Sequence, residues 1–385
     1  MLSYLSILQK LISFDSTSSK SNLDLIDWIQ AFLSEHDINP TIIYNQEKTK
    51  ANLFAHIGPE KEGGIVLSGH TDVVPAVEPD WNSNPFEMSI RDGLVYGRGT
   101  CDMKGFIAVV LYNIAKLNHN ELTAPLYLIF SYDEEVGCIG IHSALDYLRQ
   151  NNIHPDLAII GEPSMMNTIN GHKGKISVQC HVKGTCGHSS DAPNQVNAIE
   201  YAAKAIVKIS EQAERFKTEG PYDHDYTVPH NTMLTTMISG GVATNITPED
   251  CAFRFEIRHL PETQPLHVLQ KLYDDIDTQL TPGMKAVDPK CGFTWRTQFN
   301  YPGMSDACSS DAFMKLNPLF SKPSGKVSYG TEGGSFESIN GIPSIICGPG
   351  SINEAHKPNE YISLEQLERC DEFVQKLFRL MSTPG

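Results

Sequence analysis

An apolar run that ends in a row of carboxylates tells most about the fold: Leu126-Tyr-Leu-Ile-Phe-Ser-Tyr132, followed at once by Asp133-Glu134-Glu135. A short apolar run of this length is typical of a buried strand. Similar runs occupy residues 52–57, 64–68 and 157–160, and helical periodicity occupies residues 22–33, 104–117 and 139–149. Strands that alternate with helices predict a layered α/β domain with a central, mostly parallel sheet.

The pattern changes near residue 173. Strands are predicted at 175–182, 233–238 and 251–258, and long amphipathic helices at 197–214 and 265–280. This order predicts a smaller α+β domain inserted at residues 173–285. The α/β pattern returns from residue 286, with a buried strand at 344–347 and a closing helix at 363–381. We therefore predict that residues 1–172 and 286–385 form one discontinuous larger domain.

Composition narrows the class of protein. The formal net charge of −16 argues against a nucleic-acid partner, which requires a basic surface. The nine cysteines are an odd number without a CxxC pair, a usage typical of free thiols in a reducing cytosol. The first residues predict an amphipathic helix rather than a signal peptide, and no apolar run approaches the roughly 20 residues that span a bilayer. We expect a soluble, cytoplasmic protein without a membrane partner.

Five short segments contain residues that commonly bind metal ions. They are Ser68-Gly-His70-Thr-Asp72, Thr100-Cys-Asp102-Met-Lys-Gly, Asp133-Glu134-Glu135, Gly161-Glu162-Pro163 and Asn353-Glu-Ala-His356. Three of them follow predicted strand ends, which is where open α/β sheets bind ligands. Surface carboxylates in turns would explain any one of these segments, but they do not explain all five together.

A hydrolytic centre with two zinc ions accounts for the five segments. Zinc accepts His nitrogen and carboxylate oxygen, and two ions about 3.5–4 Å apart can act together on a hydrolysis. Such a pair needs one bridging carboxylate and two further ligands on each side. Five residues meet that need: His70, Asp102, Glu135, Glu162 and His356. Zinc, cobalt and manganese suit overlapping ligand sets, and we expect zinc first, with cobalt as an alternative.

Two further acids are candidates for roles beside the ligands. Asp72 lies two residues after His70, on the same face of an extended segment, and could hydrogen-bond the far nitrogen of the ring. Capping of the turn before Pro75 is its alternative. Adjacent residues of an extended chain point apart, so Glu135 can bind metal while Glu134 faces water as general base. The alternative for this pair is two solvated acids at a helix N-terminus.

At these residues the chain resembles a family of metal-dependent deacylases and exopeptidases that includes aminoacylases and glutamate-releasing carboxypeptidases, and most of all its acetylornithine-deacetylating members. The resemblance covers essentially the whole chain and keeps all five segments in order. Further supporting stretches are Gly171-His-Lys-Gly-Lys-Ile-Ser, Gly187-His188-Ser-Ser-Asp, Glu256-Ile-Arg258-His-Leu-Pro, Tyr329-Gly-Thr-Glu332 and Gly348-Pro-Gly-Ser-Ile-Asn-Glu-Ala-His356-Lys-Pro-Asn-Glu360-Tyr.

The resemblance implies a role for each metal-site residue. It makes Asp102 the bridging ligand, with a cis peptide bond after it. It places His70 and Glu162 at one ion, and Glu135 and His356 at the other. It makes Asp72 the partner of His70 and Glu134 the general base.

The resemblance also implies roles for the smaller domain, as a lid and as the contact of a homodimer. His188 would stabilise the oxyanion, often across the dimer, although Gly-His-Ser could equally be a capping turn. Arg258 would hold a substrate carboxylate, or alternatively form a surface salt bridge, and Asn245 resembles a lid asparagine near that carboxylate. Glu332 would meet an ornithine ammonium group, or alternatively be a solvated acid in a glycine-rich loop.

The implied activity is hydrolysis of N2-acetyl-L-ornithine to ornithine and acetate. The same chemistry on N-succinyl-diaminopimelate, acetylcitrulline or a dipeptide is the nearest alternative. A non-catalytic binding module on the same scaffold would lack a ligand or the base, and none is missing here. A structural dimer with accidental acidic turns would not bind metal tightly.

Overall fold

The computed structural model describes residues 2–77, 80–320 and 325–382. Contacts divide the chain into two compact units. The first unit comprises Met1–His172 and Met304–Gly385, and the second comprises Lys173–Gly303. Each unit is described below by itself.

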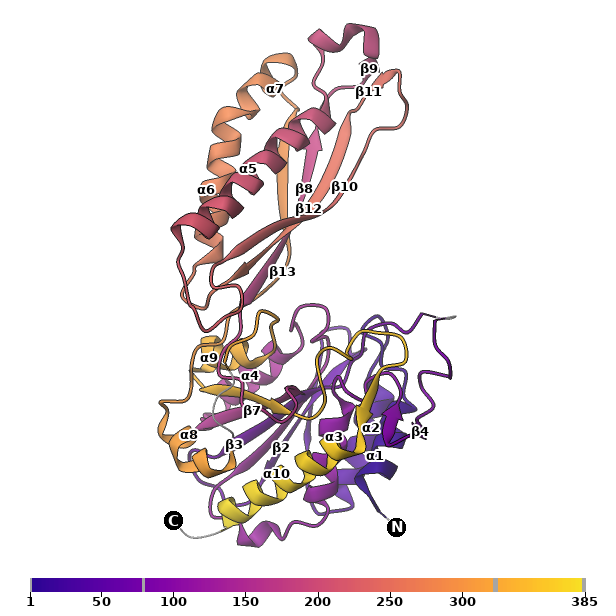
Figure 1. Ribbon diagram of the computed structural model, residues 1–385, viewed down its shortest axis with the longest axis vertical. Helices are drawn as coiled ribbons and strands as arrows, with labels where there is room; N and C mark the ends of the chain where they lie inside the picture. The colour runs from indigo at the N-terminus through magenta and orange to yellow at the C-terminus, as the bar shows by residue number, and fades with distance from the viewer. Residues whose placement is uncertain (1, 78–79, 321–324, 383–385) are drawn as a thin grey trace. The chain divides into compact units, whose positions relative to one another are not determined.

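A six-stranded sheet forms the centre of the first unit (Figure 1). Its order is β1-β2-β6-β3-β7-β14. These strands are β1 (Thr41–Tyr44), β2 (Ala51–Ile57), β6 (Leu126–Ser131), β3 (Ile65–His70), β7 (Leu157–Pro163) and β14 (Ser344–Gly348). β6, β3, β7 and β14 pair in parallel, and only β2 runs against them within this sheet. The predicted α/β class with a mostly parallel sheet is confirmed.

Helices cover both faces of this sheet. They are α1 (Tyr4–Ile12), α2 (Leu23–Ser34), α3 (Lys104–Ile114), α4 (Ile141–Gln150), α8 (Asp311–Leu316), α9 (Gly333–Asn340) and α10 (Leu364–Ser382). α1, α2, α3 and α10 share one buried cluster with alternate strand residues such as Leu128, Leu67 and Ile159. Five strands, β2, β3, β6, β7 and β14, are buried along almost their whole length, because α4 and α9 contact the sheet through its remaining residues.

A small sheet and two short helices complete this unit in the described residues, and a third short helix belongs to the second unit. The sheet joins β15 (Tyr361–Ser363), β5 (Leu94–Tyr96) and β4 (Ser89–Arg91) in antiparallel pairs. Two of the short helices are η1 (His119–Glu121) and η3 (Asn317–Leu319). Residues 361–363 pair directly with residues 94–96, so the loops on either side of this pairing are held close together.

The second unit is a sheet with helices packed on one face. The sheet has the order β10-β12-β8-β13, formed by β10 (Thr232–Gly240), β12 (Asp250–His259), β8 (Gly174–Lys183) and β13 (Gly292–Tyr301). Every second residue of β8 is buried, from Ile176 to Val182, against α5 (Ala198–Glu219), α6 (Pro265–Gln279) and α7 (Thr281–Val287). The other face is more exposed, as alternation along the strands predicts.

A short pairing extends one end of this unit. β9 (Gly187–His188) pairs with β11 (Ile246–Thr247), next to the third short helix, η2 (Ser189–Asn194). The three elements lie together beyond the end of β8 (Figure 1).

The inserted unit extends further than the predicted boundary at residue 285. β13 pairs along its whole length with β8, so residues 292–301 belong to the four-stranded sheet. Most residues of β13 are partly or fully exposed, because it is an edge strand. Its weak apolar pattern explains why the sequence assigned these residues to the larger domain.

No helix in the described part of the chain is long and apolar enough to cross a membrane.

Candidate functional site

The five predicted ligands lie at one edge of the six-stranded sheet, where its parallel strands end. His70 is the last residue of β3, Glu162 is near the end of β7, and Glu135 follows β6. Asp102 lies just before α3, and His356 lies in the loop between β14 and β15. Carboxyl ends of parallel strands meet at the same edge, so residues far apart in sequence become neighbours.

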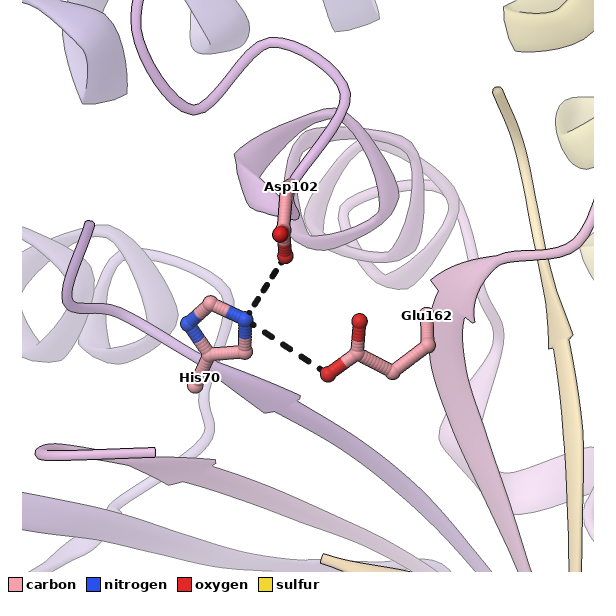
Figure 2. Close-up of side chains that lie close together, drawn as sticks. All are labelled: His70, Asp102 and Glu162. Carbon is pink, nitrogen blue, oxygen red and sulfur yellow. Dashed lines mark hydrogen bonds and ion pairs between the residues drawn. The ribbon is translucent and has the colours of Figure 1, made fainter. Parts of the chain in front are cut away.

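His70, Asp102 and Glu162 form one group of possible metal donors. One nitrogen of the His70 ring, Nε2, faces both carboxylates (Figure 2). It lies 2.9 Å from Asp102 Oδ1 and 3.6 Å from Glu162 Oε1. All three residues are buried. Burial and the neighbouring carboxylates raise the pKa of Glu162 well above its ordinary value.

Asp102, Glu135 and His356 form a second group. The imidazole Nε2 of His356 lies 3.2 Å from Asp102 Oδ2 and 2.9 Å from Glu135 Oε2. Burial, with Asp102 next, raises the pKa of Glu135 to about 7. Hydrogen bonds that the His356 ring donates to the carboxylates of Asp102 and Glu135 raise the pKa of His356 to about 11.

Asp102 is shared between the two groups, through one carboxylate oxygen on each side. Burial alone would raise its pKa, but the hydrogen bonds that its carboxylate accepts from His356 and His70 outweigh burial and lower the pKa. The peptide bond Asp102–Met103 is cis, as the resemblance implied.

The donor chemistry of the two groups fits a pair of divalent cations. Each group offers one imidazole nitrogen and oxygens from two carboxylates, which is a set that zinc accepts. The raised pKa values of Glu135 and Glu162 report buried carboxylates that repel one another. Cations between them would relieve that repulsion.

Glu134, the predicted base, belongs to neither donor group. Its side chain is half-buried, and its carboxylate accepts a weak hydrogen bond from the Cys138 thiol at 3.4 Å. Burial and the Glu135 and Asp102 carboxylates raise the pKa of Glu134 well above its ordinary value, although His70 opposes this. A carboxylate with a raised pKa beside the ligands is suited to accept and return a proton.

Asp72 contacts His70, but mainly through its backbone. Nδ1 of His70 lies 2.9 Å from the Asp72 carbonyl oxygen and 3.6 Å from its carboxylate. The carboxylate instead accepts the backbone N–H groups of Glu134 and Glu135, at 3.1 and 3.3 Å, and the Ser18 hydroxyl at 2.7 Å. The Asp72 side chain therefore holds the loop that contains Glu134, the predicted base, in addition to its contact with His70, and the sequence did not predict this second role.

Glu332 is fully buried rather than solvated in a loop. Its carboxylate accepts hydrogen bonds from the hydroxyls of Ser131 and Ser68, which belong to β6 and β3. Burial raises its pKa to about 7, although the Ser131 and Ser68 hydrogen bonds oppose this. Nε2 of His172 accepts the backbone N–H groups of Thr331 and Gly334 at 3.4 and 3.2 Å, which fixes the backbone around Glu332.

Two of the predicted residues of the inserted unit lie together. His188 pairs with Ile246 across β9 and β11, and the Asn245 carbonyl accepts the backbone N–H of Ser189 at 3.0 Å. Both side chains are exposed. Nδ1 of His188 accepts the backbone N–H of Ser190 at 3.2 Å, so the capping turn is present. The same bond leaves the ring hydrogen of a neutral His188 on Nε2.

Arg258 lies at the other end of the sheet of the inserted unit. It pairs with Lys175 at the start of β8, whereas His188 follows the end of β8 at Lys183. At about 3.3 Å per residue the two ends of β8 are roughly 26 Å apart. Arg258 donates to the Glu256 carboxylate at 3.2 Å and the Tyr301 hydroxyl at 3.3 Å. Within one copy, Asn245 therefore lies beside His188 and not beside Arg258.

The sequence of the chain matches the model of the peptidase family M20/M25/M40 over residues 66–380. The chain belongs to this family. The family match includes all five predicted ligands, which lie between residues 70 and 356. Membership establishes the chain as a hydrolase.

Relatives within this family are similar over almost their whole length. A protein of Pasteurella multocida named acetylornithine deacetylase is 33% identical over 367 residues, which are 95% of this chain and 93% of that one. A protein of Shigella sonnei with the same name is 32% identical over 384 residues, 96% of each chain.

Solved structures of the family share the fold. An M20 family metallo-carboxypeptidase from Sulfolobus solfataricus has a TM-score of 0.78 at 18% identity, with 99% of this chain and 100% of that chain covered. A tripeptidase from Staphylococcus aureus has a TM-score of 0.72 at 19% identity, with 98% of each chain covered. A dinuclear metal-binding peptidase from Bacillus subtilis has a TM-score of 0.67 at 13% identity, with 98% and 96% covered.

Three buried charged residues near the predicted ligands had no predicted role. Glu360 and Arg98 form an ion pair at 2.6 Å beside the Asp102 loop. Lys104 follows Asp102 closely, and its ammonium donates to the carbonyls of Leu11 and Phe14 near the end of α1. The sequence contained one signal for Glu360, its place four residues after His356 in the longest of the resembling stretches.

Proposed function

We propose that this chain hydrolyses the acetyl amide of N2-acetyl-L-ornithine to ornithine and acetate, with two divalent metal ions bound at His70, Asp102, Glu135, Glu162 and His356. The observation that supports it most is the pair of donor groups that share Asp102. The relatives named acetylornithine deacetylase, similar over more than nine-tenths of their length, support the choice of substrate.

Zinc is the proposed metal, and cobalt is its first substitute, because the donor atoms suit both ions. Bound divalent ions supply positive charge that polarises an amide carbonyl and acidifies water. Asp102 would serve both ions, with His70 and Glu162 on one side and Glu135 and His356 on the other.

Glu134 would move the proton in this reaction. It takes a proton from the attacking water and returns it to the leaving amine of ornithine. Burial raises its pKa, so the carboxylate binds a proton more tightly than an ordinary glutamate does, which suits it to accept the proton. Asp72 holds the backbone of Glu134, so the position of the base depends on that carboxylate.

The inserted unit would provide two substrate contacts. The Nε2–H of a neutral His188 can donate to the oxyanion that forms from the acetyl carbonyl, and Asn245 lies beside it. Arg258 can hold the ornithine carboxylate through parallel N–H donors. Glu256 and Tyr301 position its guanidinium for that task.

These contacts lead to the proposal that the working protein is a homodimer and that the inserted unit acts as its lid and contact. Arg258 lies beside one end of β8 and His188 follows the other, and these ends are roughly 26 Å apart at about 3.3 Å per residue. A molecule as small as acetylornithine cannot touch both. Two copies would bring His188 of one to the substrate held by Arg258 of the other.

Glu332 is proposed to meet the charge of the ornithine side chain. Its carboxylate is buried, and the nearby negative charge of Asp72 also raises its pKa. The positive charge of an ammonium group would instead favour the ionised form of Glu332. The proposed compartment is the cytoplasm, because all nine cysteines, which lie within the described residues, are free.

Hydrolysis assays on protein reconstituted with zinc test the proposal. N2-acetyl-L-ornithine, N-succinyl-diaminopimelate and acetylcitrulline are compared, with Glu134→Gln as the control. Preference for acetylornithine, lost in the control, is the expected result. Preference for another acyl amino acid would keep the chemistry and overturn the substrate. Two bound ions with no turnover of any of these compounds would favour a binding role.

A further inference from the structure

Glu360 is a buried carboxylate beside the two donor groups that is part of neither. It is 1% exposed and lies just before β15, four residues after His356. A buried charge is costly unless it is paired and hydrogen-bonded, so its partners indicate what it does.

All side-chain partners of Glu360 that the structure records come from the segment that ends in Asp102. Oε1 accepts the backbone N–H groups of Cys101 at 2.9 Å and Asp102 at 3.0 Å. Oε2 accepts the backbone N–H of Gly99 at 3.0 Å and Nη1 of Arg98 at 2.6 Å. One carboxylate thus satisfies four donors within five consecutive residues.

This segment has little regular structure to define it. It turns at Gly99, whose φ of +86° is a value that glycine adopts without steric strain. It then reaches Asp102 before α3 begins. Backbone N–H groups buried in such a turn need an acceptor, and Glu360 supplies it for three of them. The conformation that presents Asp102 therefore depends on a side chain from the His356 loop.

Arg98 extends the connection to a third segment. Its Nη2 donates to the Pro75 carbonyl at 3.3 Å, a few residues after His70 and Asp72. The Glu360–Arg98 pair consequently joins the segments that contain His70, Asp102 and His356.

We propose that Glu360 is a positioning residue that fixes Asp102 between the two donor groups. The inference rests on the proposed function in one respect, that these groups hold two metal ions. Replacing a residue that hydrogen-bonds to a metal ligand or its loop, without binding the metal itself, commonly changes metal affinity by about 10- to 100-fold.

The pattern of donors makes the role specific to a carboxylate. Each oxygen of Glu360 accepts two donors, and none of the four can act as an acceptor. In Glu360→Gln the amide NH2 would face two N–H groups whichever way it turned. The variant keeps the size of the side chain but loses the arrangement in which two oxygens each accept two hydrogen bonds.

Calorimetric titration of the metal-free protein with zinc tests the proposal. Asp102 belongs to both donor groups, so Glu360→Gln should weaken both binding steps, by about 10- to 100-fold each. His356→Ala should weaken one step much more than the other. Leu126→Ala is the matched control, because Leu126 is fully buried at the start of β6, at the far end of that strand from the ligands. This variant should lower the melting temperature and leave the affinity of both binding steps within about twofold of wild type, since Leu126 is not among the residues that orient the predicted ligands.

Unchanged binding in Glu360→Gln would overturn the proposal. So would an equal loss of affinity in Leu126→Ala at the same loss of melting temperature, because Glu360 would then act only through stability. Should Glu360→Gln not fold, Arg98→Lys replaces it. That variant keeps the three backbone hydrogen bonds and should weaken both steps less than tenfold, and unchanged binding would again overturn the proposal. Wild-type protein without two binding steps would instead overturn the metal centre itself.

Discussion

Replacing Glu332 by Gln should make the metal-free protein more stable at alkaline pH. Glu332 is 1% exposed, and the hydroxyls of Ser68 and Ser131 are its hydrogen-bond donors. A hydroxyl can donate or accept, so both serines can also bond to the amide of Gln. The substitution then removes a buried charge with little change in shape.

The expected gain follows from the pKa of the carboxyl. Burial raises it from 4.5 to about 7. One pKa unit corresponds to about 1.4 kcal/mol, so the ionised form of Glu332 destabilises the folded state by roughly 3 kcal/mol above pH 7.

The raised pKa of Glu332 determines how the stability of the protein changes with pH. Because the folded pKa lies above the ordinary value, the folded protein binds the proton more tightly than the unfolded chain does. Below pH 4.5 both states are protonated and the carboxyl costs nothing. As pH rises through 7 the penalty develops, so the advantage of Glu332→Gln should grow from under about 1 kcal/mol at pH 5 to about 3 kcal/mol at pH 8.

Urea unfolding at pH 5 and pH 8, with a chelator present, measures this difference. Ser131→Ala is a control of opposite sign. It removes a donor to the carboxylate, so it should destabilise the protein more at pH 8 than at pH 5. A Glu332→Gln variant that is no more stable than wild type at pH 8 would refute the reasoning. Should the same variant also lose its preference for acetylornithine, stability and substrate selection would oppose each other at this residue.

Three further predictions concern the reaction and its metals. Glu134→Gln should lower kcat by about 10²- to 10⁴-fold while both ions still bind, because Glu134 is outside both donor groups; an unchanged kcat would exclude it as the base. Asp102→Asn should weaken both steps of a zinc titration whereas His356→Ala weakens one, and a one-step effect for Asp102 would contradict its shared position. Arg258→Lys should raise the KM for acetylornithine by about tenfold or more with little change in kcat, since lysine lacks paired donors; steady-state kinetics would show an equal KM if Arg258 served only Glu256.

Local patterns in the sequence predicted most of the larger unit. The apolar run 126–132 was predicted to be a strand, and the structure has β6 at Leu126–Ser131. The acids that follow the run in sequence lie beyond the carboxyl end of β6, which is where ligands bind in such sheets. The predicted ligands form two groups for the same reason. These features depend on the order of residues along the chain, which the sequence contains directly.

Features that depend on long-range pairing were not predictable. β13 joins the sheet of the inserted unit through register with β8, and its own exposed residues give a weak strand pattern. The carboxylate of Asp72 was predicted to contact His70 and lies 3.6 Å from its Nδ1, but the same carboxylate also binds the N–H groups of Glu134 and Glu135, which was not predicted. Backbone donors have no signature in the sequence, so a side chain that binds them cannot be recognised before the fold is known.

The arrangement of charge explains why the candidate site destabilises the folded state and which contacts offset that destabilisation. Three carboxyls, those of Glu134, Glu135 and Glu162, have raised pKa values in the same buried region. Without cations these groups repel one another, so the fold must be held by other contacts. Asp72 and Glu360 provide such contacts, since each places a carboxylate among backbone N–H groups of a loop that holds a predicted ligand or the predicted base. Binding of two ions would then convert repulsion into attraction and stabilise the folded state in proportion to the logarithm of free metal concentration.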